Sequence, residues 1–476
     1  MTTIVWYRSD LRITDNPALS YAAKNAHTII PVYIYSPDDE APWAPGGASR
    51  VWLHHSLNSL DTSLQAKGSR LIIRRGAAGP VLDQLIKETG ADTVVWNRRY
   101  EPHVIDRDAK IKASLKAAGL EAKSFNSTLL FQPWEIKNKS GNPFLVFTPF
   151  YRHCLKLESP RAPSTAPRHL PPPETWPDSE PLDLLPEIPW DTGIQESWTI
   201  GEDGATEALE QLLDQRLETY SEGRDRPGQI GTSRLSPYLH FGQISPHQIW
   251  EAVTEHAAAE DTATTHAASE DYLREIIWRE YAYHLLFHFS HTPTKPLKEQ
   301  YADFPWNERT GHYDAWCRGQ TGYPMVDAGM RELWHTGWMH NRVRMIVASF
   351  LVKHLLIPWQ KGAAWFWDTL VDADLASNTM GWQWTAGCGA DAAPFFRIFN
   401  PTSQGAKFDG KGAYVRTWCP ELAHLPDKWI YDPSNAPAEV LQQAGVVLGE
   451  TYPEPIVDHK EARTKALNAL EAIKMT

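Results

Sequence analysis

Two stretches in the second half of the chain place chemically active side chains at helical spacing. In "LREIIWREY", Glu275 precedes Trp278 by three residues and Arg279 by four, so an acid, an aromatic ring and a guanidinium share one stripe of a helix. In "TGWMHNRVRMIVASF", Asn341 and Arg344 are three residues apart, and Met345 follows on the same face. Charges inside an apolar helix need partners. Each stretch predicts either the wall of a polar pocket or buried ion pairs.

Arg342 is rotated around the same helix, so we expect it to reach a different surface. A third stretch, "GTSRLSPYLHF", has Thr232 and Ser233 in a small flexible loop. Ser236 followed by Pro237 is typical of an N-cap with proline at the first helical position. Hydroxyls and free amides at a helix start suit a phosphate group, and simple capping is the alternative.

A fourth stretch, "LVDADLASNTMGWQW", gathers acidic, amide and indole side chains. Asp372, Asp374 and Asn378 are expected in an irregular polar segment. Trp382 and Trp384 follow this segment. Buried polar groups need hydrogen-bond partners. One of these aspartates is therefore the expected partner of an arginine from the second stretch, Arg344.

The 476 residues and their 42% hydrophobic content predict two domains. Residues 1–132 alternate β-branched runs with helical patterns, which predicts an α/β domain with a doubly wound parallel sheet. No GxGxxG fingerprint follows the first run, which argues against a dinucleotide there. Residues 133–199 are expected to form a proline-rich linker, extended from about residue 155, and 200–476 an all-α domain.

Strands and helices are expected to alternate in the first domain. The strands are 3–8, 29–35, 70–75 and 92–100, and the helices between them are 16–25, 49–68, 78–90 and 104–120. The main helices of the second domain are 204–220, 271–289, 326–337, 340–356 and 363–371.

Composition restricts the partners and the compartment. The net charge of -12 disfavours general coating of nucleic acid, so any DNA site must be a local basic patch. The four cysteines have no metal-binding spacing, and no metal site is expected. Because the chain lacks a leader and any uninterrupted apolar run of membrane-spanning length, we expect a cytoplasmic protein that has no membrane contact.

Five motifs in the same order resemble the flavin domain of the DNA photolyase and cryptochrome family. They are "GTSRLSP", "IIWREYAYHL", "TGYPMVDAGMRELWHTGWMHNRVRMIVASFLVK", "LVDADLASNTMGWQW" and "PFFRIFNPTSQGAKFD". The start "VWYRSDLRITDNPAL" is similar to the first strand and helix of the family, so the resemblance covers essentially the whole chain. It implies an antenna-chromophore domain at 1–132 and a helical FAD-binding catalytic domain at 200–476.

The resemblance implies FAD folded into a U within the helical domain. The implied contacts are Tyr220, Thr232, Ser233, Arg234, Leu235, Ser236, Arg279, Trp338, Asn341, Arg344, Asp372, Asp374 and Asn378. The hydroxyls of the "GTSRLSP" loop would hold the diphosphate. Arg344 and Asp372 would pair near the isoalloxazine ring, and Asn378 would face its N5. Trp382, Trp359 and Trp306 match the chain of tryptophans that relays an electron to photoexcited flavin, and core packing is the alternative for each.

By the same resemblance, Glu275, Trp278, Asn341, Met345 and Trp384 match enzymes that act on cyclobutane pyrimidine dimers. The two tryptophans would hold a flipped-out dimer, and Glu275 and Asn341 would bond its bases. Repairers of the (6-4) lesion have histidines around positions 341 and 345, and neither Asn341 nor Met345 is His here. Candidates for the rim that grips DNA phosphates are Arg224, Arg226, Arg342, Arg397 and Lys407.

The function implied is light-dependent repair of cyclobutane pyrimidine dimers by electron transfer from reduced FAD, with a monomer acting on single- or double-stranded DNA. The family's use of base flipping is established for photolyases in general. The chain is most similar to bacterial photolyases of the branch near plant cryptochromes. A blue-light photoreceptor with the same FAD is the alternative, and Asn378, which is aspartate in plant cryptochromes, together with the short C-terminal end favours repair.

A second, antenna chromophore is expected on the N-terminal sheet. Its candidate contacts are Asn97, Arg98, Glu101 and His103, which follow a strand of a parallel sheet. Methenyltetrahydrofolate is preferred over deazaflavin, although Val104 stands where folate binders often have an acid, and a second flavin is a further alternative. A nucleotide hydrolase or adenylyl transferase on this sheet is disfavoured because no glycine-rich phosphate loop is present.

Overall fold

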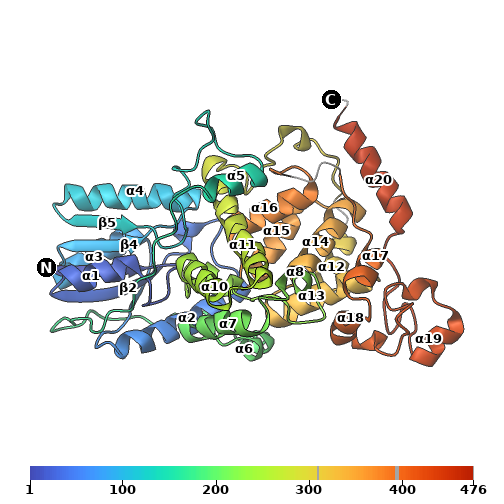
Figure 1. The fold of residues 1–476 in the computed structure, drawn as a ribbon, viewed down its shortest axis with the longest axis horizontal. Helices are drawn as coiled ribbons and strands as arrows, with labels where there is room; N and C mark the ends of the chain where they lie inside the picture. The colour runs from blue at the N-terminus through green and yellow to red at the C-terminus, as the bar shows by residue number, and fades with distance from the viewer. Residues whose placement is uncertain (308–309, 392–395, 475–476) are drawn as a thin grey trace.

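The computed structural model describes residues 1–307, 310–391 and 396–474. A parallel sheet forms the N-terminal end of the molecule, and helices form the rest (Figure 1). The strands are β1 (Thr2–Tyr7), β2 (Thr28–Tyr35), β3 (Ile72–Arg75), β4 (Thr93–Asn97) and β5 (Glu121–Phe125). Their order is β3-β2-β1-β4-β5, and every neighbouring pair is parallel, which confirms the predicted doubly wound α/β domain.

The fifth strand, β5, was not predicted. Its residues Glu121, Lys123 and Ser124 are polar, so the segment lacks the β-branched run that marks the other strands. It lies at the edge of the sheet and pairs only with β4, where polar side chains are tolerated.

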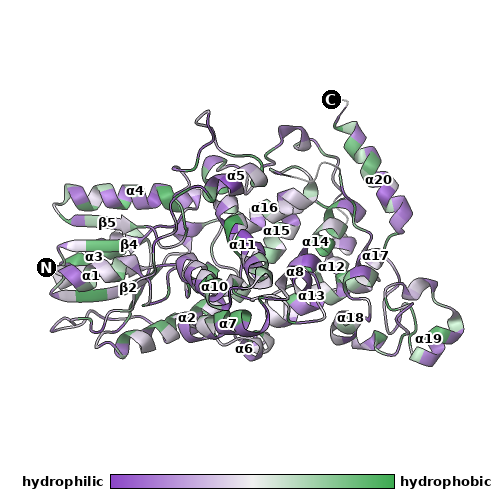
Figure 2. Cartoon of the chain, in the orientation of Figure 1, coloured by the Kyte–Doolittle hydropathy of each residue, from purple (hydrophilic) through white to green (hydrophobic). Residues whose placement is uncertain are grey.

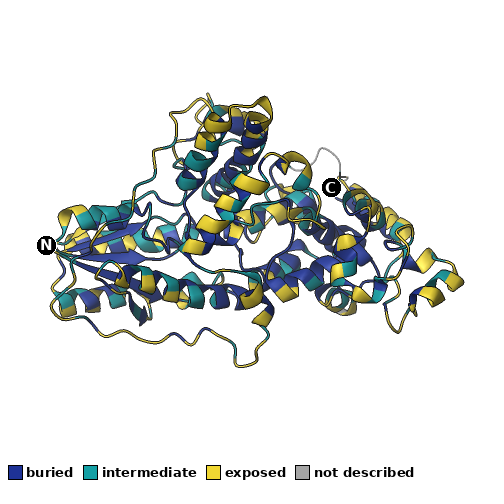
Figure 3. Cartoon of the chain, turned by 60° about the horizontal axis from the view of Figure 1, so that its bottom comes forward, coloured by how far each residue is buried: buried dark blue, intermediate teal, exposed yellow. Residues whose placement is uncertain are grey.

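The sheet is covered on both faces by four helices, α1 (Pro17–Asn25), α2 (Gly47–Gln65), α3 (Ala78–Thr89) and α4 (Pro102–Ala117). Alternate residues of each strand point to opposite faces. Ile4 and Trp6 therefore pack with α3 and α4, whereas Val5 and Tyr7 pack in the core that includes α1 and α2. The three central strands, β1, β2 and β4, are mostly apolar and are buried along nearly their whole length (Figures 2 and 3).

The remainder of the chain is helical. Its α-helices are α5 (Phe147–Cys154), α6 (Thr192–Ser197), α7 (Glu202–Gln215), α8 (Tyr220–Gly223), α9 (Ser236–His240), α10 (Pro246–Glu260), α11 (Ala263–His288), α12 (Thr310–Cys317), α13 (Pro324–Thr336), α14 (Asn341–Ser349), α15 (Trp359–Thr369), α16 (Leu375–Ala386), α17 (Pro401–Phe408), α18 (Ala413–Trp418), α19 (Ala438–Ala444) and α20 (His459–Ala472). A π-helical turn, η3 (Phe350–His354), continues α14, and short 3₁₀ turns are η1 (Asp38–Glu40), η2 (Glu299–Tyr301), η4 (Pro420–Leu422) and η5 (Pro433–Asn435).

The predicted linker, 133–199, is not extended throughout. It contains α5, which packs on α11, and α6, which packs on α13. The extended course expected from about residue 155 is therefore wrong for 192–197, where six residues free of proline form a helical turn and a half. The domain boundaries at 132 and 199 stay a prediction.

A buried polar junction fixes the sheet against the helices. The Arg12 guanidinium donates to the carbonyl of Gly242 at 2.8 Å and to the hydroxyl of Ser127 at 2.5 Å. Asp15 accepts from the hydroxyl of Ser245, the N-cap of α10, at 2.6 Å. Because each group would be costly if buried alone, this network holds the loop after β1 against the start of α10.

Helix α15 approaches α16 through a glycine. A Cβ atom on Gly362 would lie 2.1 Å from Cη2 of Trp382 and 2.6 Å from Cδ2 of Leu351. Only the lack of a side chain lets the two helices pack this closely, and the ring that benefits is one of the predicted relay tryptophans.

We predict that Gly362→Ala lowers the free energy of unfolding by about 1–3 kcal/mol through overpacking. The matched control is Gly311→Ala in α12, where a Cβ meets no atom within 4 Å and alanine should instead raise stability by up to about 1 kcal/mol. Urea unfolding followed by tryptophan fluorescence measures both changes. Unchanged stability of Gly362→Ala would show that the ring of Trp382 moves aside at little cost.

Candidate functional site

A large cavity of about 600 Å³ lies inside the helical part of the chain. Its walls come from α8, α9, α11, α14 and α16, which surround one region although they are far apart in sequence (Figure 1). The polar and charged lining residues are Tyr220, Arg224, Ser233, Ser236, His240, Tyr272, Glu275, Arg279, Asn341, Arg342, Arg344, Asp372, Asp374, Ser377, Asn378 and Thr385. A cavity of this volume accommodates a ligand of dinucleotide size.

Helix α11 presents its predicted stripe to this cavity. Glu275, Trp278 and Arg279 all line it, which confirms the pocket-wall prediction. The alternative, an ion pair between Glu275 and Arg279, is wrong: Glu275 accepts from Nη1 of Arg224 at 2.5 Å, and Arg279 donates to the carbonyl of Thr128 at 2.7 Å. The stripe is thus held by partners outside its own helix.

The Trp278 ring has a fixed orientation because it stacks on Phe147 of α5. The two ring centroids are 3.5 Å apart and the planes differ by 7°. Such a stack adds to area burial and restricts both side chains. One face of Trp278 is therefore covered, and its remaining surface borders the cavity.

Helix α14 contributes Asn341, Arg344 and Met345 to the cavity, as their spacing predicted. Arg342 lines the same cavity, so the expectation that it reaches a different surface is wrong. Its long side chain folds back, because Nη2 pairs with Asp225 at 2.6 Å and Nη1 lies 3.8 Å from the sulfur of Met345.

Arg344 forms the ion pair expected with one of the nearby aspartates. Its Nη2 lies 2.8 Å from Oδ2 of Asp372, and its Nε donates to the carbonyl of Met339 at 2.7 Å. The second carboxylate oxygen of Asp372, Oδ1, is buried and has no hydrogen-bond partner. This oxygen belongs to a cavity-lining residue, so it is available to a bound ligand.

Asp374 is the N-cap of α16 and accepts from the backbone N–H of Ser377 at 2.8 Å. It also accepts from the hydroxyl of Tyr283 and faces Nδ1 of His240 at 3.9 Å. Burial by itself would raise the pKa of Asp374, but His240, Arg279 and the Tyr283 hydroxyl outweigh it, so the pKa lies well below its usual range. Asp374 is therefore a fixed negative charge at the cavity.

Asn378 lies on α16, so the irregular segment predicted for it is wrong at this residue. Asp374 caps α16, so the helix begins at Leu375, before Asn378. The amide nitrogen of Asn378 donates to the carbonyl of Ala363 at 3.0 Å, whereas its Oδ1 is buried without a partner. Oδ1 of Asn378 is thus a second acceptor of the cavity lining that receives no hydrogen bond from the protein.

The serine-rich loop also reaches the cavity, through Ser233, Leu235 and Ser236. Ser236 is the first residue of α9 and Leu235 is its N-cap, so the predicted capping role of Ser236 is wrong. The Ser236 hydroxyl instead accepts from the indole Nε1 of Trp338 at 3.2 Å. Its position therefore depends on a contact made across the fold.

Other predicted residues lie outside the cavity lining. Thr232, Arg234, Trp338, Trp306, Trp359 and Lys407 are absent from its walls. Arg234 has a left-handed backbone, with φ of 55°, and its guanidinium lies 4.2 Å from the ring centroid of Trp198 and 4.9 Å from that of Trp338. Arg234 thus packs behind the serine-rich loop, on the side away from the cavity. Lys407 is exposed on α17.

The three predicted relay tryptophans share one apolar cluster. Trp382 is buried and lines the cavity, Trp359 is buried within the cluster, and Trp306 is half-buried and packs against it. Phe304 adjoins the last ring, with centroids 4.4 Å apart. The common cluster and the graded burial are compatible with a path from the cavity to the surface.

The four residues predicted to contact an antenna chromophore differ in whether they have a polar atom free to bind it. The amide of Asn97 donates to Asp10 and to Asn16 at 2.6 and 2.7 Å, so it serves the fold. Glu101 pairs with Arg99 at 2.8 Å. Arg98 donates to the carbonyl of Ser124, and Nε2 of His103 is buried without a partner. Of these four residues, only the imidazole of His103 has an unused buried nitrogen.

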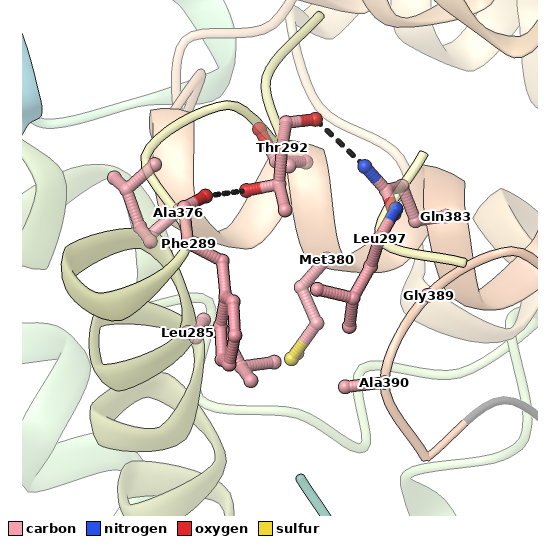
Figure 4. A pocket seen from close by; sticks show the side chains of 12 residues that line it. Leu285, Phe289, Thr292, Leu297, Ala376, Met380, Gln383, Gly389 and Ala390 are labelled. Carbon is pink, nitrogen blue, oxygen red and sulfur yellow. Dashed lines mark hydrogen bonds between the residues drawn. The ribbon is translucent and has the colours of Figure 1, made fainter. Parts of the chain in front are cut away.

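A smaller cavity of about 20 Å³ lies between α11 and α16 (Figure 4). Gln383 closes it by donating to the carbonyl of Thr292 at 2.7 Å and to that of Lys295 at 2.9 Å. Its walls are otherwise mostly apolar, with Leu285, Phe289 and Met380 facing inward (Figure 4). It has room for about one water molecule and is a packing gap.

Sequence reasoning missed several functional side chains. His240 and Tyr272 line the cavity, and Glu332 supports it from α13. Oε2 of Glu332 accepts from the hydroxyl of Tyr414 at 2.6 Å and from the backbone N–H of His340, the N-cap of α14, at 3.3 Å. His240 and Glu332 lie within stretches already quoted from the sequence, but only contacts in the folded chain show what these three side chains touch.

Burial raises the pKa of Glu332 to about 7, above its unfolded value. The folded state therefore favours the protonated carboxyl, and the resulting stability is present at low pH and is lost as pH rises through about 7. We predict that Glu332→Gln, which keeps an oxygen acceptor without charge, gains thermal stability over the wild type as pH rises from about 5 to about 8.

Thermal unfolding of both proteins at each pH measures this difference, with Glu210→Gln on the exposed surface of α7 as the control that should not change it. A difference between Glu332→Gln and the wild type that stays constant with pH would mean that Glu332 does not titrate in this range.

Among the described residues, no helix is long and apolar enough to cross a membrane, and no group of acidic, histidine and cysteine side chains could hold a metal ion. Two family models match the chain. One describes DNA photolyase and covers residues 3–173, and the other describes the FAD binding domain of DNA photolyase and covers residues 272–472.

Individual proteins are similar over nearly the whole chain. A deoxyribodipyrimidine photo-lyase of Agrobacterium fabrum is 50% identical over 99% of this chain and 98% of that protein. Cryptochrome-1 of Arabidopsis thaliana is 40% identical over 98% of this chain and 70% of that protein. The crystal structure of a bacterial class III photolyase from Agrobacterium tumefaciens superposes with a TM-score of 0.96 at 50% identity, over 100% of this chain and 98% of that one. The chain therefore belongs to the DNA photolyase and cryptochrome family.

Proposed function

We propose that this protein repairs cyclobutane pyrimidine dimers in DNA in a light-dependent reaction, as a deoxyribodipyrimidine photo-lyase. The observation that carries the proposal is the single cavity whose walls include both a polar cofactor-sized lining and the set Glu275, Trp278, Asn341, Met345 and Trp384. Full-length similarity to a bacterial deoxyribodipyrimidine photo-lyase supports it.

The lining fits FAD. Asp372 Oδ1 and Asn378 Oδ1 are buried acceptors without partners, as expected where a ligand supplies the donors. Arg279 and Arg344 offer positive charge, and the hydroxyls of the α9 loop suit phosphate oxygens. The residues that would hold the cofactor are Tyr220, Ser233, Leu235, Ser236, Arg279, Asn341, Arg344, Asp372, Asp374 and Asn378, with Thr232, Arg234 and Trp338 supporting them from behind. When bound, reduced FAD supplies the photoexcited electron donor.

The chain itself binds and orients the lesion. Trp278 and Trp384 offer apolar ring surface to a dimer turned out of the helix, which loses little stacking because it is already distorted. The Glu275 carboxylate can accept from base N–H groups, and the Asn341 amide can donate to base carbonyls. Arg224 forms an ion pair with Glu275 at 2.5 Å and so holds that carboxylate in place.

Phosphate binding is assigned to the basic residues around the cavity. Arg224 and Arg342 line it, and Lys407 is exposed on α17. These charges would form the local positive patch that a chain of net charge -12 requires for DNA. They grip the backbone without reading sequence, as suits an enzyme that recognises damage.

The remaining assignments extend this proposal. Methenyltetrahydrofolate would be the antenna chromophore near His103, with a deazaflavin as the alternative. The protein would act as a monomer in the cytoplasm, since the four buried free thiols, Cys154, Cys317, Cys388 and Cys419, suit a reducing compartment.

The test is recovery of thymine absorbance when reduced protein is illuminated with blue light in the presence of an oligonucleotide containing one thymine dimer. We expect recovery with the wild type and with the control Glu210→Ala/Trp334→Ala, whose residues are exposed outside the cavity. Glu275→Ala/Trp278→Ala should keep FAD but lose about 2 kcal/mol or more of dimer-specific binding. Retained discrimination by that variant would refute the pocket assignment.

A photoreceptor is the second candidate, because the chain is also 40% identical to a cryptochrome over 98% of its length. Wild-type protein that binds FAD and reduces it under light, but repairs no dimer, would favour the photoreceptor.

Trp306, Trp359 and Trp382 are proposed to relay electrons from the surface to the cofactor. We predict that Trp306→Phe slows photoreduction of oxidised FAD several-fold and spares repair by protein reduced beforehand, because phenylalanine keeps the packing but is much harder to oxidise. Time-resolved flavin absorbance measures the rate, with Trp250→Phe on α10 as the control. Loss of repair by prereduced Trp306→Phe would contradict a relay role.

A further inference from the structure

A third cavity, of about 400 Å³, lies where the end of β5, the start of α1 and the start of α10 meet the segment 158–161 of the predicted linker. We call it the sheet-edge cavity. None of the residues that line it also lines the larger cavity assigned to FAD. It is therefore a separate place where a ligand can bind.

The lining of the sheet-edge cavity includes a buried histidine. His247, the second residue of α10, is 3% exposed, and neither of its ring nitrogens has a hydrogen-bond partner in the part of the chain that the structure describes. The carbonyl of Leu129 approaches the ring, but a carbonyl can satisfy only an N–H. At least the acceptor nitrogen of His247 is therefore without a protein partner.

The unused nitrogen of His247 selects a ligand that donates a hydrogen bond. Burial and the nearby charge of Arg161 lower the pKa of His247 to about 4, so the ring is neutral at physiological pH and keeps a lone pair on one nitrogen. A buried polar atom is costly without a partner. A ligand with an N–H group would supply the missing donor.

The other walls of the cavity are flat and apolar. Phe125 and Phe131 are half-buried, and Pro17 adds the surface of its ring. The ring of Phe125 lies against Tyr21, with the two centroids 5.4 Å apart. The backbone N–H of Phe131 donates to Oε2 of the buried Glu280 at 3.1 Å, which fixes that segment. Aromatic walls held in this way favour a flat ring system over a flexible chain.

The exposed part of the lining disfavours a phosphate. Arg161 donates to both oxygens of the buried Asp15 carboxylate, at 2.5 Å from Nη1 and 3.1 Å from Nη2, so its charge is already paired. Glu158 adds an exposed negative charge. A phosphate would be repelled by this carboxylate, whereas sugar hydroxyls can donate to Glu158 and to the hydroxyl of Ser159.

We propose that the sheet-edge cavity binds an uncharged nucleoside. Its base lies against the phenylalanine rings, an amino group of the base donates to His247, and the sugar hydroxyls lie near Glu158 and Ser159. The cavity volume is within the range of small-molecule sites. This proposal does not depend on the proposed repair function, because it rests on residues outside the larger cavity.

The experiment is isothermal titration calorimetry with adenosine, and with ribose and adenosine monophosphate for comparison. Protein loaded with FAD is used, so that adenosine does not enter the larger cavity. His247→Leu removes both ring nitrogens, and Ser159→Trp places a large ring at the exposed edge of the cavity without changing a buried residue. The matched controls are His27→Leu and Thr165→Trp, which change exposed residues outside the cavity.

We expect one adenosine to bind per chain, and His247→Leu and Ser159→Trp each to weaken its binding about tenfold or more. Both controls should bind adenosine as the wild type does. Adenosine monophosphate should bind at least about tenfold more weakly than adenosine, and ribose should not bind measurably.

Three results would overturn the proposal. The first is that adenosine does not bind the wild type with a Kd below about 1 mM. The second is that Ser159→Trp binds adenosine as the wild type does, which would place the nucleoside elsewhere and does not depend on how well His247→Leu folds. The third is that adenosine monophosphate binds as tightly as adenosine, which would contradict an uncharged ligand.

Discussion

The ion pair between Arg344 and Asp372 is the interaction on which the cavity depends. It joins the first turns of α14 to the segment that leads into α16, so it sets the distance between two walls. Removal of Arg344 would leave the buried Asp372 carboxylate without its partner, at a cost of about 3–5 kcal/mol. The pair leaves Oδ1 of Asp372 unused, so the same interaction that supports the wall also supplies a ligand acceptor.

Other polar side chains of the cavity are likewise held in place by contacts within the protein. Asp374 is fixed by the α16 backbone, Tyr283 and His240, and Asn378 uses only its amide nitrogen within the protein. Each side chain is oriented by one set of contacts and keeps an atom or a face for the cavity. Such orientation before binding reduces the free energy that ligand and substrate must spend on ordering the site.

The aromatic residues divide into two groups by their packing. Trp278 is fixed on one face by the ring of Phe147 in α5, so this part of the cavity wall is held in place. Trp382 is enclosed by Phe366, Trp316 and the bare backbone at Gly362, deep in the second apolar cluster. The two rings thus line one cavity from different helices, α11 and α16, and each is fixed by its own aromatic neighbours.

The sequence by itself determined the fold class, the helical stripes of α11 and α14 and the residue types of the cavity, because periodicity and local spacing are encoded within short segments. It did not determine β5, whose polar residues are accepted only at a sheet edge, or the start of α16 at Asp374. Only the tertiary structure paired Glu275 with Arg224, turned Arg342 toward the cavity and placed Glu332 under α14. Those outcomes depend on contacts between different elements of the fold, and no local pattern records which charge or backbone group will be the partner.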